Sequence, residues 1–284
     1  MNPLYILAVI AVLVVGNYVN KHWRKWWYRN DLTFPSAPKR TDLYYGYYGC
    51  LDEQVAETKG HINLHMESQF SGIPKTIQNM LDANADCMLD VSYQVFSEYT
   101  PGQYRTVHPD ATDRLHDFFR TLQDADVLKQ VKIIYPIDEP NNTVGSQDEL
   151  TKAVGIIRTV AARFPELAGY KLAVIYAADK PFIGQDLYDW VGFDDYDMKS
   201  HVLVGKQYKA LKDSLHPFQK TIVIPGGAYG QDPKPFIDFA QGNPEVAMVM
   251  PFLWFDDRGG SVGASGIRSN GMAAKYIAAG MSVV

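Results

Sequence analysis

Acidic and aromatic residues follow several short apolar runs of this chain. Asp138 and Glu139 come directly after one such run, and Asp90 lies near the end of another. Hydrolysis of a glycosidic bond needs two carboxyl groups, one as proton donor and one as nucleophile or base. Aromatic rings stack on the apolar faces of sugars, and carboxylates bind their hydroxyls. The pattern predicts a site for a glycan or polysaccharide. The alternative for each acid is a helix cap or a surface ion pair. The residues predicted to contact the substrate are Tyr45, Tyr47, Asp90, Asp195, Tyr196, Trp254 and Asp256.

Alternating strands and helices are expected to position these residues. Eight apolar or aromatic runs predict strands, namely Leu43–Cys50, His61–Met66, Ala85–Val91, Val131–Ile137, Lys171–Ala177, Trp190–Tyr196, Thr221–Pro225 and Val246–Trp254. Apolar spacing of three and four residues predicts helices over Ile73–Asn84, Asp110–Leu128, Gln147–Phe164, Val204–Leu215, Pro233–Gln241 and Ser269–Met281, with Asp110 and Ser146 as N-caps.

The number and spacing of these units favour a closed barrel. Eight βα units in about 240 residues match an α/β protein of the (β/α)₈ (TIM barrel) class. An open doubly wound sheet would show fewer strands and a glycine-rich phosphate loop, and neither GxGxxG nor GxxxxGK[ST] occurs. In such a barrel, functional side chains lie just beyond the C-terminal ends of the strands.

The first thirty residues predict a membrane segment. Leu4–Val15 is uninterrupted apolar or aromatic, and Trp23, Trp26 and Trp27 fall where an interfacial aromatic belt is expected. We therefore expect an uncleaved, single-pass transmembrane anchor with its basic and aromatic flank over residues 1–29, contacting the bilayer through residues 4–27. A linker follows over 30–40 and the barrel over 41–284. The alternatives are a cleaved signal peptide and a short buried helix or hairpin. Four cations follow the segment, so the positive-inside rule places the barrel in the cytoplasm.

Charge and cysteine content exclude several functions. The chain has 27 Lys and Arg against 32 Asp and Glu, a net charge of −5. Four of the cations lie within residues 21–29. The rest of the chain therefore has 23 Lys and Arg against 32 Asp and Glu, a net charge of −9, which excludes nucleic acid as a partner. Two cysteines provide neither a disulfide framework nor a Cys-based zinc site. His61 and His65 would lie about 13 Å apart on a strand, too far to share one metal ion. No metal or cofactor is expected.

Three motifs give the chain a family resemblance. Ile137-Asp-Glu-Pro-Asn141 resembles the (Asn/Asp)-Glu-Pro signature of the clan A (β/α)₈ glycoside hydrolases. Trp190–Tyr196 is similar to their strand six, and Pro251–Trp254 to their strand eight, which carries a tryptophan at the sugar site. The resemblance implies that Glu139 is the general acid/base and that Asp138 takes the position of its companion Asn or Asp. It also implies that Tyr196 and Trp254 are aromatic residues of the substrate site.

Strand seven departs from that family. The family ends this strand with a nucleophilic glutamate, whereas Thr221–Tyr229 contains no acid. Three outcomes remain open. In the first, another carboxylate, namely Asp195, Asp197, Asp256 or Glu67, serves as base and the configuration at the anomeric carbon is inverted. In the second, the substrate assists its own hydrolysis. In the third, the barrel keeps a glycan site without turnover. The last would be a glycan-binding or structural subunit of a membrane-associated assembly, with membrane proteins as its partners.

Overall fold

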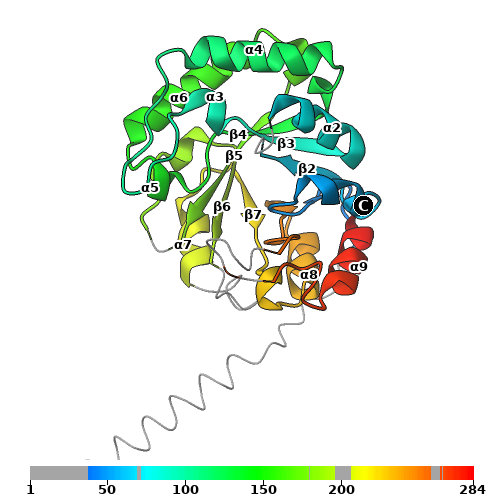
Figure 1. Ribbon diagram of the computed structural model, residues 1–284. Helices are drawn as coiled ribbons and strands as arrows, with labels where there is room; N and C mark the ends of the chain where they lie inside the picture. The colour runs from blue at the N-terminus through cyan, green and yellow to red at the C-terminus, as the bar shows by residue number, and fades with distance from the viewer. Residues whose placement is uncertain (1–37, 69–71, 179, 196–205, 257–262, 264) are drawn as a thin grey trace, which may run out of the picture.

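The chain folds as an eight-stranded parallel barrel surrounded by helices (Figure 1). The computed structural model describes residues 38–68, 72–178, 180–195, 206–256, 263 and 265–284. Neighbouring strands follow the order β1-β8-β7-β6-β5-β4-β3-β2. All eight predicted strands are confirmed, most of them shorter than expected. Their bounds are β1 Tyr44–Tyr45, β2 Leu64–Glu67, β3 Asp86–Asp90, β4 Val131–Tyr135, β5 Lys171–Ala177, β6 Trp190–Asp194, β7 Lys220–Val223 and β8 Val246–Val249.

Asn63 and Gly46 close the barrel between β1 and β2. The Asn63 amide N donates to the Tyr45 carbonyl at 3.1 Å, and the Asn63 side chain bonds the Tyr45 amide (2.7 Å) and the Leu43 carbonyl (2.9 Å). A Cβ on Gly46 would lie 2.1 Å from the Leu64 carbonyl oxygen. The asparagine side chain therefore replaces ladder hydrogen bonds, and only glycine permits the close approach of the two strands.

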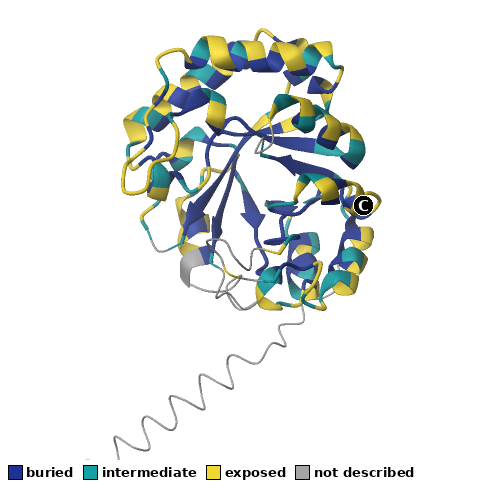
Figure 2. Ribbon diagram, viewed as in Figure 1, coloured by how far each residue is buried: buried dark blue, intermediate teal, exposed yellow. Residues whose placement is uncertain are grey.

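The strands are buried on both faces, so the core has two layers (Figure 2). One layer fills the barrel interior and includes Leu64, Met88, Ile133 and Met248. The other lies between the strands and the helices. This arrangement explains why the strands are continuous apolar runs without alternation.

Helices cover the outside of the barrel with their apolar faces inward (Figures 1 and 2). The six predicted helices are confirmed with small shifts at their ends: α2 Ile73–Ala83, α4 Ala111–Asp124, α6 Gln147–Ala161, α7 Lys206–Ser214, α8 Lys234–Gly242 and α9 Ala273–Val283. Short helices fill other connections: η1 Asp52–Thr58, α3 Ser92–Val95, η2 Leu128–Gln130, α5 Pro140–Thr143, η3 Pro165–Leu167, η4 Gln185–Leu187 and η6 Gly227–Tyr229.

One of the two predicted helix caps is confirmed. Ser146 Oγ accepts a hydrogen bond from the Glu149 amide N, as an N-cap does. Asp110 precedes α4, but its side chain makes no capping bond. Its carboxylate instead lies 3.7 Å from His108 Nδ1.

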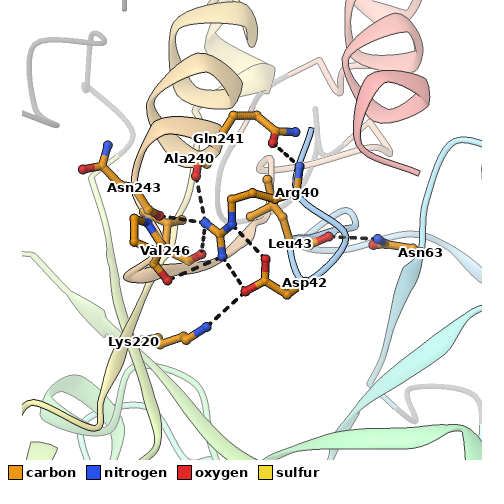
Figure 3. Close-up of polar contacts among 10 residues, drawn as sticks. Arg40, Asp42, Leu43, Asn63, Lys220, Ala240, Gln241, Asn243 and Val246 are labelled. Atoms are coloured by element: carbon orange, nitrogen blue, oxygen red, sulfur yellow. Dashed lines mark hydrogen bonds and ion pairs between the residues drawn. The ribbon is translucent and has the colours of Figure 1, made fainter. Parts of the chain in front are cut away.

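Arg40 fastens the start of the domain to the N-terminal end of the barrel, called here the bottom (Figure 3). Its guanidinium donates to the carbonyls of Ala240 (2.9 Å), Asn243 (2.7 Å) and Val246 (2.9 Å), and it pairs with Asp42 at 2.9 Å. Three carbonyls at the end of α8 and the start of β8 are thereby satisfied by one cation. Arg40, the last residue of the predicted linker, is thus bound to the barrel.

The predicted membrane anchor lies outside the described residues. This applies to residues 1–29, to the predicted bilayer contact over 4–27 and to most of the 30–40 linker. Within the described ranges, no helix combines the length and apolar character that a membrane crossing requires.

Candidate functional site

Asp138 lies at the C-terminal mouth of the barrel, just beyond β4, where the sequence predicted it. The hydroxyls of Tyr48 and Tyr135 both donate to its Oδ1, the latter at 2.7 Å. Among the described residues, Oδ2 has no side-chain partner in a hydrogen bond, and the residue is exposed to solvent. The carboxylate is thus fixed through one oxygen and presents the other at the mouth.

Asp90 is a second carboxyl group in the same place. It ends β3, is 7% exposed, and its Cα is the register partner of Tyr135 on β4. The Ser92 amide N donates to Asp90 Oδ1 at 2.7 Å. Because Met88 and Ile133, two residues earlier on each strand, face the barrel interior, Asp90 and Tyr135 face it as well.

The pKa values of both carboxyl groups are raised. Burial raises the pKa of Asp90 to about 7, and the nearby charge of Asp138 adds to this effect. Although Asp138 keeps exposed surface, the protein packed around its carboxyl group removes part of its hydration and raises its pKa to about 6, while both tyrosine hydroxyls and the Glu139 backbone lower it. Two neighbouring carboxyl groups with pKa values near neutrality can hold one proton between them, as in sites for acid/base chemistry.

Glu139 follows Asp138 at the start of the short helix α5. Its backbone is left-handed, with φ 41° and ψ 62°, and its amide N donates to the Ile175 carbonyl on β5 at 3.1 Å. The Asn142 side chain donates to Glu139 Oε2 at 2.8 Å. The side chain is half-buried. A non-glycine residue held in this conformation is a common feature of functional sites.

Tyr45 and Tyr47 occupy the outer core layer. Tyr45 is fully buried and its hydroxyl donates to the Tyr276 carbonyl on α9 at 2.8 Å, while Tyr47 is 3% exposed. The prediction that these two residues contact a substrate therefore needs correction, because their rings pack between strands and helices. Tyr48 and the partly buried Tyr44 are the tyrosines of this run that pack with the interior layer.

Trp254 also lies in the outer layer. It is 3% exposed, and its ring centroid lies 4.6 Å from that of Tyr47 and 5.7 Å from that of His61. The predicted role of Trp254 in the substrate site is corrected for the same reason. Phe252 takes the interior position on this segment, with its ring 5.6 Å from that of Tyr48.

The other predicted carboxylates are distributed unevenly. Asp195 follows β6 and is half-buried, whereas Tyr196 and Asp197 lie outside the described residues. Asp256 is exposed and accepts hydrogen bonds from the Gly266 amide N (2.8 Å) and the Ser269 hydroxyl, so it organises the segment after β8. Glu67 packs between β2 and α2, where it bonds His65 (2.9 Å) and Thr76 (2.9 Å). Glu67 is therefore not the base that the sequence left open.

Strand β7 brings no carboxylate to the mouth. After Val223 the chain turns through Gly226 and Gly227, and a Cβ on Gly227 would lie 2.4 Å from the Ile267 side chain. The Gly226 amide N donates to the Gln231 side chain at 2.8 Å. The tight turn thus fills the place where the resembling family has its nucleophile.

Two cavities among the described residues are not lined by Asp138. A cavity of about 460 Å³ lies between α8 and α9, beside the ion pairs of Asp232 and Lys234, and a smaller one of about 140 Å³ lies near Cys50 and Glu67. Among the described residues, no group of three His, Cys, Asp or Glu side chains is placed to hold a metal ion.

Sequence reasoning missed Tyr48, Tyr135 and Phe252. Each belongs to an apolar or aromatic run in which neighbouring residues face opposite layers. The available signal was the two-residue period: Tyr135 lies two residues after Ile133, and both face the interior.

Solved structures with the same fold are glycoside hydrolases. A GH2 beta-galacturonidase from Eisenbergiella tayi bound to galacturonate aligns with a TM-score of 0.54 at 10% identity, over 87% of this chain and 52% of that one. A glycoside hydrolase family 17 beta-1,3-glucanosyltransferase from Rhizomucor miehei aligns with a TM-score of 0.52 at 13% identity, over 80% and 92%. A glucosidase from Croceicoccus marinus aligns with a TM-score of 0.54 at 9% identity, over 87% and 68%.

These likenesses establish the fold of the chain as a glycoside-hydrolase-like (β/α)₈ barrel, as the sequence motifs indicated. The chain spans about half the length of the galacturonidase. No protein-family model matches the chain. No curated protein matches it by sequence.

Proposed function

We propose that the barrel binds a glycan or polysaccharide at its C-terminal mouth and hydrolyses it, with Glu139 as the proton donor. The observation that carries this proposal is the placement of Asp138: a carboxylate held by Tyr48 and Tyr135, beside Asp90 and directly before Glu139. These residues lie where barrel enzymes carry their catalytic groups. The glycoside hydrolases with the same fold support a sugar substrate.

Replacement of Glu139 by glutamine tests the proposal. Glutamine keeps the shape of the side chain and removes its transferable proton, so turnover should fall by roughly 10² to 10⁴ while glycan binding persists. A glycan panel would be scored for binding and for reducing-end release. The matched control is Glu245→Gln, because Glu245 precedes β8 at the bottom of the barrel and pairs with Lys212. Full release by the Glu139→Gln protein would disprove the assignment.

A second candidate function is a catalytically silent, glycan-binding or structural subunit of a membrane-associated assembly. The absence of a carboxylate from residues 224–231, the turn that follows β7, favours this reading. Binding of panel glycans by the wild-type protein without release of any product would select it over hydrolysis.

Attachment to a membrane through residues 4–27 is part of the same proposal, with the barrel on the cytoplasmic side. It is supported by the apolar run, the tryptophans after it and the four following cations. Membrane fractions would be extracted with alkaline carbonate and the mass of the retained protein measured. A soluble protein that begins after about residue 16 would contradict the anchor. Protease accessibility in inverted and right-side-out vesicles would decide the side.

A further inference from the structure

The absence of a carboxylate after β7 raises the question of which atom attacks the sugar. Residues 224–231, from the end of β7 through the tight turn, contain no acid. Glu67 is engaged between β2 and α2, and Asp256 binds its own segment. Asp90 is 7% exposed, accepts the Ser92 amide N–H, and its burial favours the protonated form, which is a poor nucleophile. A double displacement without an enzyme carboxylate needs a nucleophile within the substrate. The oxygen of a 2-acetamido group is such a nucleophile, because the group is attached to C2, the carbon beside C1, and attack of its oxygen on C1 closes a five-membered ring.

The geometry of Asp138 suits an acetamido group. Its Oδ1 accepts two tyrosine hydroxyls, whereas Oδ2 has no side-chain partner within the described part of the chain. A fixed acceptor can hold the acetamido N–H and so aim the carbonyl oxygen at C1. Tyr48, which binds this carboxylate, packs its ring against that of Phe252 in the barrel interior.

We infer that the substrate is a β-linked 2-acetamido-2-deoxy sugar, that its own carbonyl oxygen is the nucleophile, and that Asp138 orients the acetamido group. This inference rests on the proposed hydrolytic function and names its substrate class. Attack from the face opposite the leaving group requires a 1,2-trans glycoside, which in gluco- or galacto-configured sugars is the β anomer.

Hydrolysis then proceeds in two chemical steps. The acetamido oxygen bonds to C1, the bond from C1 to the leaving oxygen breaks, and the Glu139 carboxyl gives its proton to that oxygen. Asp138 holds the N–H of the resulting oxazolinium ion. Water then bonds to C1 and gives a proton to Glu139, the bond from C1 to the carbonyl oxygen breaks, and the acetamido group is restored. One water is consumed and no other reactant is needed.

Paired substrates test this inference. The probes are 4-nitrophenyl β-glycosides of N-acetylglucosamine and of chitobiose, their 2-hydroxy counterparts from glucose and cellobiose, the N-trifluoroacetyl analogues, and the thiazoline of N-acetylglucosamine. We expect the acetamido compounds to be cleaved, fluorination to slow them at least about tenfold by weakening the nucleophile, and the thiazoline to inhibit. Asp138→Asn should lower kcat roughly 10²-fold, because its amide would bond the tyrosines through oxygen and turn an NH₂ toward the substrate N–H.

The controls separate this inference from the proposed function. Asp213→Asn alters an exposed carboxylate on α7 that pairs with Lys209, and should leave kcat unchanged. Equal cleavage of the 2-hydroxy series, or full activity of Asp138→Asn on acetamido substrates, would overturn the inference and leave hydrolysis intact. Release from neither series nor from the wider glycan panel, by protein with a normal unfolding transition, would overturn both.

Discussion

The hydroxyl of Tyr135 donates a 2.7 Å hydrogen bond to Oδ1 of Asp138. Tyr135 ends β4 and is fully buried, while Asp138 lies three residues further at the barrel mouth. This contact stabilises the ionised carboxylate and so lowers its pKa. Loss of hydration acts in the opposite direction and raises the pKa. The position and the charge state of Asp138 therefore depend on the same buried residue.

Tyr135→Phe should shift the pH dependence of turnover. Loss of one hydroxyl removes a hydrogen bond that favours the ionised form, so the pKa of Asp138 should rise above about 6. The acidic limb of the kcat profile should then move upward by about one pH unit. A profile measured on the best panel glycan checks this, and an unmoved acidic limb would contradict it. Tyr170→Phe, on the segment before β5, is a control expected to keep the wild-type profile.

The stability of the protein should fall as pH rises through the pKa of Asp90. Its folded-state pKa is about 7, against an ordinary value of 3.8, so the folded state binds a proton that the unfolded chain loses near pH 4. Stabilisation from this group is fully present below pH 4 and is lost between about pH 4 and pH 7.

Asp90→Asn isolates this contribution. Asparagine stays neutral at every pH, so the free energy of unfolding of the variant, relative to wild type, should increase by at least about 2 kcal/mol from pH 4 to pH 7. Urea unfolding at several pH values measures both proteins. A difference that stays constant with pH would show that Asp90 keeps an ordinary pKa.

Arg40→Ala should destabilise the barrel strongly. Three carbonyls at the bottom would lose a charged donor, and we expect the free energy of unfolding to fall by about 3 kcal/mol. Arg40→Lys keeps the charge but not the planar fork, so its loss should be intermediate. Chemical unfolding of the three proteins gives the order, and a lysine variant as unstable as the alanine variant would contradict the role of charge.

Gly46→Ala should prevent normal closure of the barrel. Its Cβ would meet the Leu64 carbonyl at 2.1 Å, and neither strand can retreat without losing the Asn63 hydrogen bonds. A loss of at least about 3 kcal/mol is expected in thermal unfolding. Gly155→Ala on α6 is the matched comparison, since its Cβ would meet no atom within 4 Å. That change should stabilise the helix by about 1 kcal/mol, and similar midpoints for the two variants would refute the argument.

Tyr188→Phe should stabilise the protein. The Tyr188 hydroxyl is buried without a hydrogen-bond partner in the described part of the chain, so removing it should add about 1 kcal/mol to the free energy of unfolding. Tyr176→Phe should do the opposite, because the Tyr176 hydroxyl donates to the Ile183 carbonyl at 2.6 Å. Loss of stability in both variants would indicate that Tyr188 has a partner.

The fold was predictable from sequence because the eight strands are short continuous apolar runs and the six helices carry apolar residues at three- and four-residue spacing. The orientation of individual aromatic side chains was not. Strands buried on both faces give no alternation of polar and apolar residues, so nothing in Tyr44–Tyr48 distinguishes inward from outward tyrosines. Trp254 was expected at the mouth because of the family resemblance, whereas the structure places Phe252 in the interior layer.

The carboxylates Asp90 and Asp138 were predictable because a charged residue at the end of an apolar run is conspicuous. Their mutual influence was not, since it depends on the register that pairs Asp90 with Tyr135 across β3 and β4. Glu67 was misassigned for a related reason. One residue beyond an inward Met66, it faces α2 instead of the mouth.

The clamp formed by Arg40 determines how the barrel would stand on a surface. Arg40 binds beside α8 and the start of β8 (Figure 3), at the N-terminal end of the strands, whereas Asp138 lies beyond the C-terminal end of β4. A bilayer anchor in residues 4–27 would thus hold the barrel by its base, with the open end directed away from the lipid. Long polymers could then reach Asp138 and Glu139 from the aqueous phase without passing between the protein and the membrane.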